Sequence, residues 1–349
     1  MIGLDYGNAR VRVRAGFLLD IDDYAELIGS STLEAMLGRL ASGPYGPAVE
    51  RSLGRHSGLR RLDEAVRSHL SGQLSDVVSF YSGEIADRLR AYEARWDIRN
   101  IRSILRSLAD ASTGEGSIPL LVSTAAIDDA ALDEIAAQDD VRSAVDLLSI
   151  WQLPGPQVVR HLRRATDRYT ETGDVSHFET ALDSALEETV GEANSRFGSD
   201  DPVVERLRRE LDRINLMSCA RLFALSEQAP EWRPLGGGMV PAAVWSEAMA
   251  VGDRRGVASR VGGRLPASWR DPLEEWVEHG DPTRLEAWLD DAWADDAGTM
   301  LRRDPLGIET PLGYLGRLEA EAKNLRMVGR AIVHEIPPEQ AMGLLVGVA

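Results

Sequence analysis

Clustered carboxylates are the residues of this sequence whose type and spacing could support catalysis. Three clusters each place three or four acids within a few residues of one another: Asp22-Asp23 with Glu26, Asp128-Asp129 with Asp133-Glu134, and Asp290-Asp291 with Asp295-Asp296. Hard cations need clustered oxygen ligands of this kind, and such clusters hold Mg²⁺ against a diphosphate in all-α synthases. One alternative for this chain is therefore a magnesium-dependent all-α enzyme that acts on a diphosphate.

A simpler explanation of these clusters is the acidity of the whole chain. The 349 residues include 56 Asp and Glu against 39 Lys and Arg, for a net charge of −17, and acidic clusters arise by chance at that density. Acids are also stabilising at helix N-termini, next to the positive end of the helix dipole. Lys323 is the only lysine, so the lysines that would hold a diphosphate are missing. We favour solvated helix faces and helix N-termini.

Other catalytic patterns are missing from the sequence. A phosphate-binding loop ends in Gly-Lys, but Lys323 follows Ala322. The six histidines include no pair four positions apart, the spacing of a helical zinc site. Cys219, the only cysteine, lies in an apolar helical stripe, which predicts a packed thiol rather than a nucleophile. We predict no catalytic, cofactor-binding or metal-binding residue.

A short pattern recurs along the chain at nearly even intervals. It consists of an acid, an asparagine three positions later, and an arginine six positions after the asparagine. The four copies are Asp5/Asn8/Arg14, Asp97/Asn100/Arg106, Asp212/Asn215/Arg221 and Glu321/Asn324/Arg330. The asparagines are 92, 115 and 109 positions apart, which exceeds the ~20–50 residues of a solenoid unit. The spacing fits three copies of one small domain, with the first copy of the pattern at the N-terminus.

On a helix, this pattern places the acid and the asparagine on one face together with apolar residues such as Ile101 and Ile104. An asparagine among apolar side chains costs free energy unless its amide is hydrogen-bonded. We therefore predict a buried asparagine–acid cluster that fixes how the helix packs in its own domain. The arginine points the other way and is predicted to reach a neighbouring domain. Chance recurrence of so loose a pattern is the alternative.

Helical periodicity dominates the elements that must position these residues. Apolar residues recur about every 3.6 positions, as in Val203, Leu207 and Leu211, and alternating β-branched runs are nearly absent. Asp201-Pro202 has the form of a helix start, with an aspartate cap and proline at the first position. The predicted fold class is all-α.

Two turn-rich connectors, residues 110–119 and 229–238, divide the chain. Each is followed by a small-residue apolar stretch, residues 121–127 and 239–244, which we expect to begin a new helix. The connectors predict three helical domains, at residues 1–115, 116–232 and 233–349.

Charge and hydropathy limit the partners of this chain. A net charge of −17 argues against nucleic acid, whose phosphates need many Lys and Arg, and against docking on anionic lipid through charge alone. The longest uncharged runs, residues 116–127 and 234–246, are shorter than the ~20 residues of a membrane span. A single cysteine indicates a reducing compartment. We expect a soluble, cytoplasmic protein with no direct membrane span.

The sequence resembles the C subunits of the A/V-type ATP synthases, which are the counterparts of the d subunits in eukaryotic vacuolar ATPases. Tyr6-Gly-Asn-Ala-Arg-Val-Arg-Val-Arg14 resembles the start of that family, and residues 97–106 are similar to its recurrent Asn-Leu helix. The C-terminal order agrees as well: DPLGI at 304–308, Tyr314-Leu315, EAKNLR at 321–326, and Ile336-Pro337. The resemblance covers the whole chain. One departure is Met217, where the other copies have Arg102 and Arg326.

The resemblance implies a funnel-like all-α protein of three similar helical domains around a pseudo-three-fold axis. It implies a non-catalytic central-rotor subunit without a cofactor, peripheral on the cytoplasmic face of the membrane. Such a subunit links the central shaft, made of the D and F subunits, to the membrane proteolipid ring and transmits torque for rotary ion transport. Close-packed helices have the low compressibility that this role needs. The diphosphate enzyme and an unrelated helical adaptor remain the alternatives.

Overall fold

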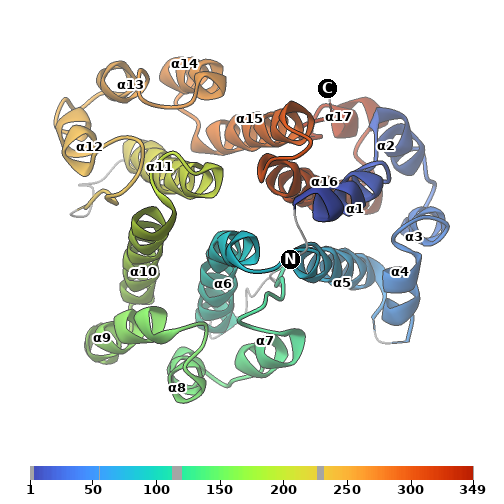
Figure 1. Ribbon diagram of the computed structural model, residues 1–349, viewed down its shortest axis with the longest axis horizontal. Coiled ribbons are helices and arrows are strands. Elements are labelled where there is room, and N and C mark those ends of the chain that lie inside the picture. Colours follow the sequence, from blue (N-terminus) through green and yellow to red (C-terminus); the bar gives the residue numbers. More distant parts are fainter. Residues whose placement is uncertain (1–3, 55, 112–119, 226–231, 349) are drawn as a thin grey trace. The chain divides into compact units, whose positions relative to one another are not determined.

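A computed structural model describes residues 4–54, 56–111, 120–225 and 232–348, and these residues form helices and loops without a β-strand (Figure 1). The all-α prediction is confirmed. None of the helices in these ranges combines the length and apolar character that a bilayer span requires.

The described helices follow the same order of lengths three times: several shorter helices, then two long ones. The first run contains α2 (Ile21–Ile28), α3 (Leu33–Ala41), α4 (Gly46–Ser52), α5 (Gly58–Ser79) and α6 (Glu84–Ala111). The second contains α7 (Asp129–Ala136), α8 (Val141–Trp151), α9 (Pro156–Thr172), α10 (Ser176–Phe197) and α11 (Pro202–Ala224). The third contains α12 (Ala242–Met249), α13 (Arg254–Val261), η1 (Ala267–Trp269), α14 (Arg270–His279), α15 (Pro282–Arg303) and α16 (Glu309–Val333). Helix α1 (Leu4–Ala15) precedes these runs, and α17 (Pro338–Met342) follows them.

The first two helices of each run begin at regularly spaced N-caps. These are Asp20 and Thr32, Asp128 and Asp140, and Pro241 and Asp253, 12 residues apart in every run. Every cap except Pro241 accepts a backbone N–H of the first turn through its side-chain oxygen, an interaction worth about 1 kcal/mol. The predicted start of α11 is confirmed in the same way, because Asp201 accepts the N–H of Val203.

The long helices contribute apolar stripes to the core. In α5, fully buried side chains recur every three or four residues: Leu62, Val66, Leu70, Leu74 and Val77. Burying each such side chain contributes about 1.5–3 kcal/mol. Helices α5, α10 and α15 are each 22 residues long, longer than the helices that precede them in their runs.

The chain separates into two compact units, one formed by residues 1–86 with 290–349 and the other by residues 87–289. In the first unit, α16 packs against α1, α2, α3 and α5, and Figure 1 shows α1 beside α16. In the second unit, α10 packs against α9 and α11, and α12 packs against α13. The division into domains 1–115, 116–232 and 233–349 stays a prediction. Its first boundary, and connector residues 112–119 and 229–231, lie outside the described residues.

Candidate functional site

Three of the four predicted asparagines each hold both backbone groups of a single later residue. Asn100 on α6, Asn215 on α11 and Asn324 on α16 are at most 2% exposed. Each donates its side-chain amide to the carbonyl of one residue and accepts the N–H of the same residue, at 2.7–3.0 Å. The residues held are Val122, Leu235 and Val346, which lie 20 to 22 positions after the asparagine. We call this arrangement the asparagine clamp.

The acid three residues before each clamp asparagine is also buried and holds a further residue. Asp97 accepts the hydroxyl of Thr124, and Glu321 accepts the N–H of Leu19 at 2.6 Å. Asp212 accepts the N–H groups of Met239 and Val240 and the indole N–H of Trp245. In all three cases the held residues lead into the first short helix of a run: Thr124 into α7, Leu19 into α2, and Met239 and Val240 into α12. The predicted buried asparagine–acid pairs therefore connect one helical run to the start of another.

Burial raises the pKa of all three carboxyls. The pKa of Asp97 and that of Glu321 rise to about 7, and that of Asp212 rises to about 6, because desolvation of the ionised form outweighs the hydrogen bonds that favour it. Folding therefore favours the protonated form of each group. The stability that each group contributes is complete below its unfolded pKa, near 4, and is lost as the pH rises through the folded pKa.

The substitution Glu321→Gln tests this linkage. Glutamine stays neutral, so the free energy of unfolding of the variant should rise relative to wild type between pH 4.5 and 7, on the order of 2–3 kcal/mol in total. Above pH 7 the difference should stay constant. Urea titrations at intervals from pH 4.5 to 8 measure it. Glu26→Gln, at an exposed position of α2, is the control, and parallel pH profiles of wild type and Glu321→Gln would contradict the assignment.

The first copy of the pattern has a different structure. Asn8 on α1 is buried, but it donates to the carbonyls of Pro305 and Gly307, both at 2.9 Å, and accepts the hydroxyl of Tyr81. It therefore holds the loop between α15 and α16. Asp5 is exposed, so this copy has no buried acid beside its asparagine.

The arginine of every copy pairs with a carboxylate on another helix. Arg14 meets Asp76 on α5 at 2.7 Å. The other three pairs are Arg106 with Glu179 on α10, Arg221 with Glu286 on α15 at 3.3 Å, and Arg330 with Asp63 on α5 at 3.7 Å. In these three pairs the acid lies in the first two turns of a 22-residue helix. These three pairs also join the predicted domains: Arg106 joins the first to the second, Arg221 the second to the third, and Arg330 the third to the first.

A second arginine position, two residues after the clamp asparagine, repeats part of this pairing. Arg102 pairs with Asp183, and Arg326 pairs with Asp63 at 2.7 Å. Met217 replaces the arginine in the middle copy and is buried. The departure noted in the sequence therefore removes one ion pair of this kind.

Two further arginines on α6, Arg95 and Arg99, join Arg102 and Arg106, and the three-residue pattern did not identify them. Arg95, Arg99, Arg102 and Arg106 follow the three-to-four spacing of a single helix face. With Arg213 and Arg221 of α11 they line a cavity of about 270 Å³ in the unit formed by residues 87–289. The helical spacing of the four arginines is the signal that could have found this site in the sequence.

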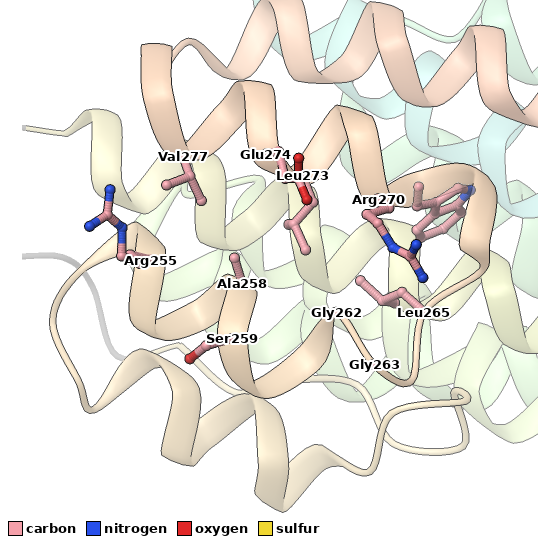
Figure 2. Close-up of a pocket in the computed structure, with 11 residues that line it drawn as sticks. Arg255, Ala258, Ser259, Gly262, Gly263, Leu265, Arg270, Leu273, Glu274 and Val277 are labelled. Atoms are coloured by element: carbon pink, nitrogen blue, oxygen red, sulfur yellow. The ribbon is translucent and has the colours of Figure 1, made fainter.

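A larger cavity of about 470 Å³ lies between α13 and α14, and the residues that line it include Leu265, Trp269 and Leu273. Figure 2 shows Arg255 and Arg270 at opposite ends of this cavity, with Leu273 between them. The described residues that line it include neither a histidine nor a cysteine. Its lining is mainly apolar and includes one carboxylate, that of Glu274.

The acidic clusters have structural partners. Asp23 completes a capping box with Asp20 at the start of α2, and Asp128 caps α7. Asp290 forms an ion pair with Lys323 at 2.8 Å. Among the residues that the structure describes, no group of three or more His, Cys, Asp or Glu side chains is placed to hold a metal ion. Helix N-termini therefore account for Asp23 and Asp128, and an ion pair accounts for Asp290.

Comparisons with known proteins agree with the resemblance. The model of the ATP synthase (C/AC39) subunit family matches residues 7–344. The chain is similar to the C subunit of the A-type ATP synthase of Methanocaldococcus jannaschii, with 23% identity across 98% of this chain and 86% of the relative. It is similar to the C subunit of the V-type ATP synthase of Thermus thermophilus, with 27% identity across 96% of each chain. The corresponding A-type protein of Methanothermobacter thermautotrophicus is 25% identical across 93% of this chain and 83% of the relative.

Proposed function

Because this chain belongs to the ATP synthase (C/AC39) subunit family, we propose that it is a non-catalytic central-rotor subunit of an A/V-type ATP synthase or ATPase. In this role it links the D and F subunits of the central shaft to the membrane proteolipid ring and transmits torque for rotary ion transport. It is then peripheral on the cytoplasmic face of the membrane. The observation that carries the proposal is the family match over residues 7–344.

Torque transfer needs a body whose parts do not slide past one another, and the contacts of the repeated pattern suit that need. A clamp makes two hydrogen bonds to one backbone residue, so a sliding segment would lose both together. The pairs Arg106–Glu179, Arg221–Glu286 and Arg330–Asp63 join the three predicted domains in cyclic order. These contacts support a pseudo-three-fold, funnel-like arrangement of domains 1–115, 116–232 and 233–349.

The contacts between the third and first predicted domains further support this arrangement. Between the first and second domains, and between the second and third, the clamped residue and the residue held by the acid belong to one continuous connector. Here Asn324 clamps Val346 near the C-terminus, while Glu321 holds Leu19 near the N-terminus. Gly347 adds an N–H donated to Asp291 at 2.7 Å and a carbonyl that accepts from Arg317. Two segments far apart in the sequence thus take the place of one connector.

Co-purification tests the proposed partners. The full chain carrying an affinity tag is mixed with the D–F shaft complex and, separately, with the detergent-solubilised proteolipid ring at physiological ionic strength. We expect it to retain both. In membranes depleted of this chain, its return should restore ATP-driven ion transport, while ATP hydrolysis by the detached soluble head should not depend on it. Failure to retain either partner would reject the rotor role and favour a helical adaptor with other partners.

A further inference from the structure

Six arginines surround the 270 Å³ cavity of the unit formed by residues 87–289, in a chain whose net charge is −17. Arg95, Arg99, Arg102 and Arg106 lie on one face of α6, and Arg213 and Arg221 come from α11. The same lining contains four carboxylates: Glu179, Asp183, Glu210 and Glu286. The cavity therefore has an excess of positive charge, opposite in sign to the protein as a whole.

The ion pairs show how this charge is held. Arg99 donates to Glu210 at 2.5 Å, and Arg102 and Arg106 donate to Asp183 and Glu179 respectively. Glu286 is shared, because it lies 3.3 Å from Arg221 and 4.0 Å from Arg213. Glu286 thus faces two guanidinium groups of α11, and the six guanidinium groups of the lining outnumber its four carboxylates.

The environment of Glu210 also indicates an excess of positive charge in this cavity. This carboxyl is 4% exposed, and burial alone would raise its pKa. Instead Arg99, Arg95 and Arg213 together hold its pKa below the usual range. Arg95 itself is 1% exposed, and burial lowers its pKa to about 10, with Arg99 and Arg206 acting in the same direction.

We infer that this cavity binds a polyvalent oxyanion of the phosphate type. Planar guanidinium groups match the geometry of phosphate oxygens and donate to them in pairs. A volume of 270 Å³ is several times the ~30 Å³ that one water occupies in the liquid, which leaves room for a phosphate or diphosphate group. Arg106 and Arg221 keep 50% and 57% of their side-chain surface exposed, so an ion from solvent reaches both. The ligand is either free phosphate or diphosphate, or the phosphate groups of a nucleotide.

Isothermal titration calorimetry of the full chain tests the inference, with inorganic phosphate, pyrophosphate and ATP as separate titrants without Mg²⁺ at constant ionic strength. We expect pyrophosphate to bind more tightly than phosphate, because its higher charge meets more guanidinium groups. Arg106→Gln and Arg221→Gln should each weaken pyrophosphate binding about tenfold, the usual effect of removing one charge-assisted hydrogen bond. ATP that binds more tightly than pyrophosphate identifies a nucleotide as the source, and weaker binding of ATP identifies the free anion.

Two further variants separate binding from folding. Arg142→Gln changes an exposed arginine of α8 in the same unit but outside the cavity lining, where it lies 4.0 Å from Asp146. Its affinity for pyrophosphate should equal that of wild type. Glu179→Gln removes a carboxylate from the lining and should tighten binding several-fold, an effect that unfolding cannot produce. Pyrophosphate that does not bind at about 10 mM, or binding that Arg142→Gln weakens as much as Arg106→Gln, would overturn the inference.

Discussion

Replacing Asn215 by alanine is expected to lower the free energy of unfolding by about 3–5 kcal/mol. The side chain is 1% exposed and makes both of its clamp bonds to Leu235, which is itself 8% exposed. Alanine leaves the N–H and the carbonyl of Leu235 buried without these partners, and each unsatisfied group costs about 1–3 kcal/mol. The space vacated by the amide adds a cavity term.

Urea unfolding followed by tryptophan fluorescence measures this loss. Trp245 is a useful reporter because it is buried and donates its indole N–H to Asp212, one helical turn from Asn215. Asn194→Ala is the matched control, since Asn194 lies on the exposed face of α10 and its replacement should change stability by less than ~0.5 kcal/mol. Equal effects of the two substitutions would show that the clamp contributes nothing beyond helix propensity.

The comparison of Asn8 with Asn215 explains how far the repeated pattern could be interpreted from sequence. Helical periodicity places an asparagine on an apolar face, and burial of all four asparagines follows from that. Burial of the acid depends on which element covers its helix. On α1, which is only 12 residues long, Asp5 stays exposed. A pattern of three residue types identifies the helix face but not the neighbouring element that buries it.

The clamp partners could not be predicted because they are backbone groups. Val122, Leu235 and Val346 are aliphatic like many other residues of the chain, and they lie beyond the end of the helix that holds them. The partners of the arginines in the ion pairs could not be predicted from the sequence either. Arg106 was predicted to face outward, but only the packing of α6 against other helices selects Glu179 among the 56 acids of the chain. By contrast, the helix start at Asp201 depends on local capping, which the sequence contains in full. Residues 121–127 were expected to begin a helix, but they form a loop, and α7 begins only after its cap Asp128.

Gly313→Ala is expected to be the most disruptive single-methyl change in the unit formed by residues 1–86 and 290–349, costing about 3 kcal/mol or more. Gly313 is buried on α16, where a Cβ would lie 2.4 Å from the amide nitrogen of Leu301 and 2.5 Å from the carbonyl oxygen of Ala297. Both atoms belong to the backbone of α15, so no side-chain rotation relieves the overlap. The two helices must separate, which places the change at the severe end of overpacking.

The opposite result is expected from Gly191→Ala, which makes the same chemical change at an exposed position inside α10. No atom lies within 4 Å of the Cβ that alanine adds there, so the variant gains helix propensity and should be about 0.5–1 kcal/mol more stable than wild type. Urea titrations of both variants then give changes of opposite sign. Because α16 also carries Glu321 and Asn324, separation of α15 from α16 in Gly313→Ala should speed amide hydrogen exchange at Leu19 and Val346, whose N–H groups those side chains accept. A Gly313→Ala variant as stable as wild type, with unchanged exchange at both amides, would mean that the contact between α15 and α16 tolerates a methyl group and that rigidity of the clamp does not depend on this glycine.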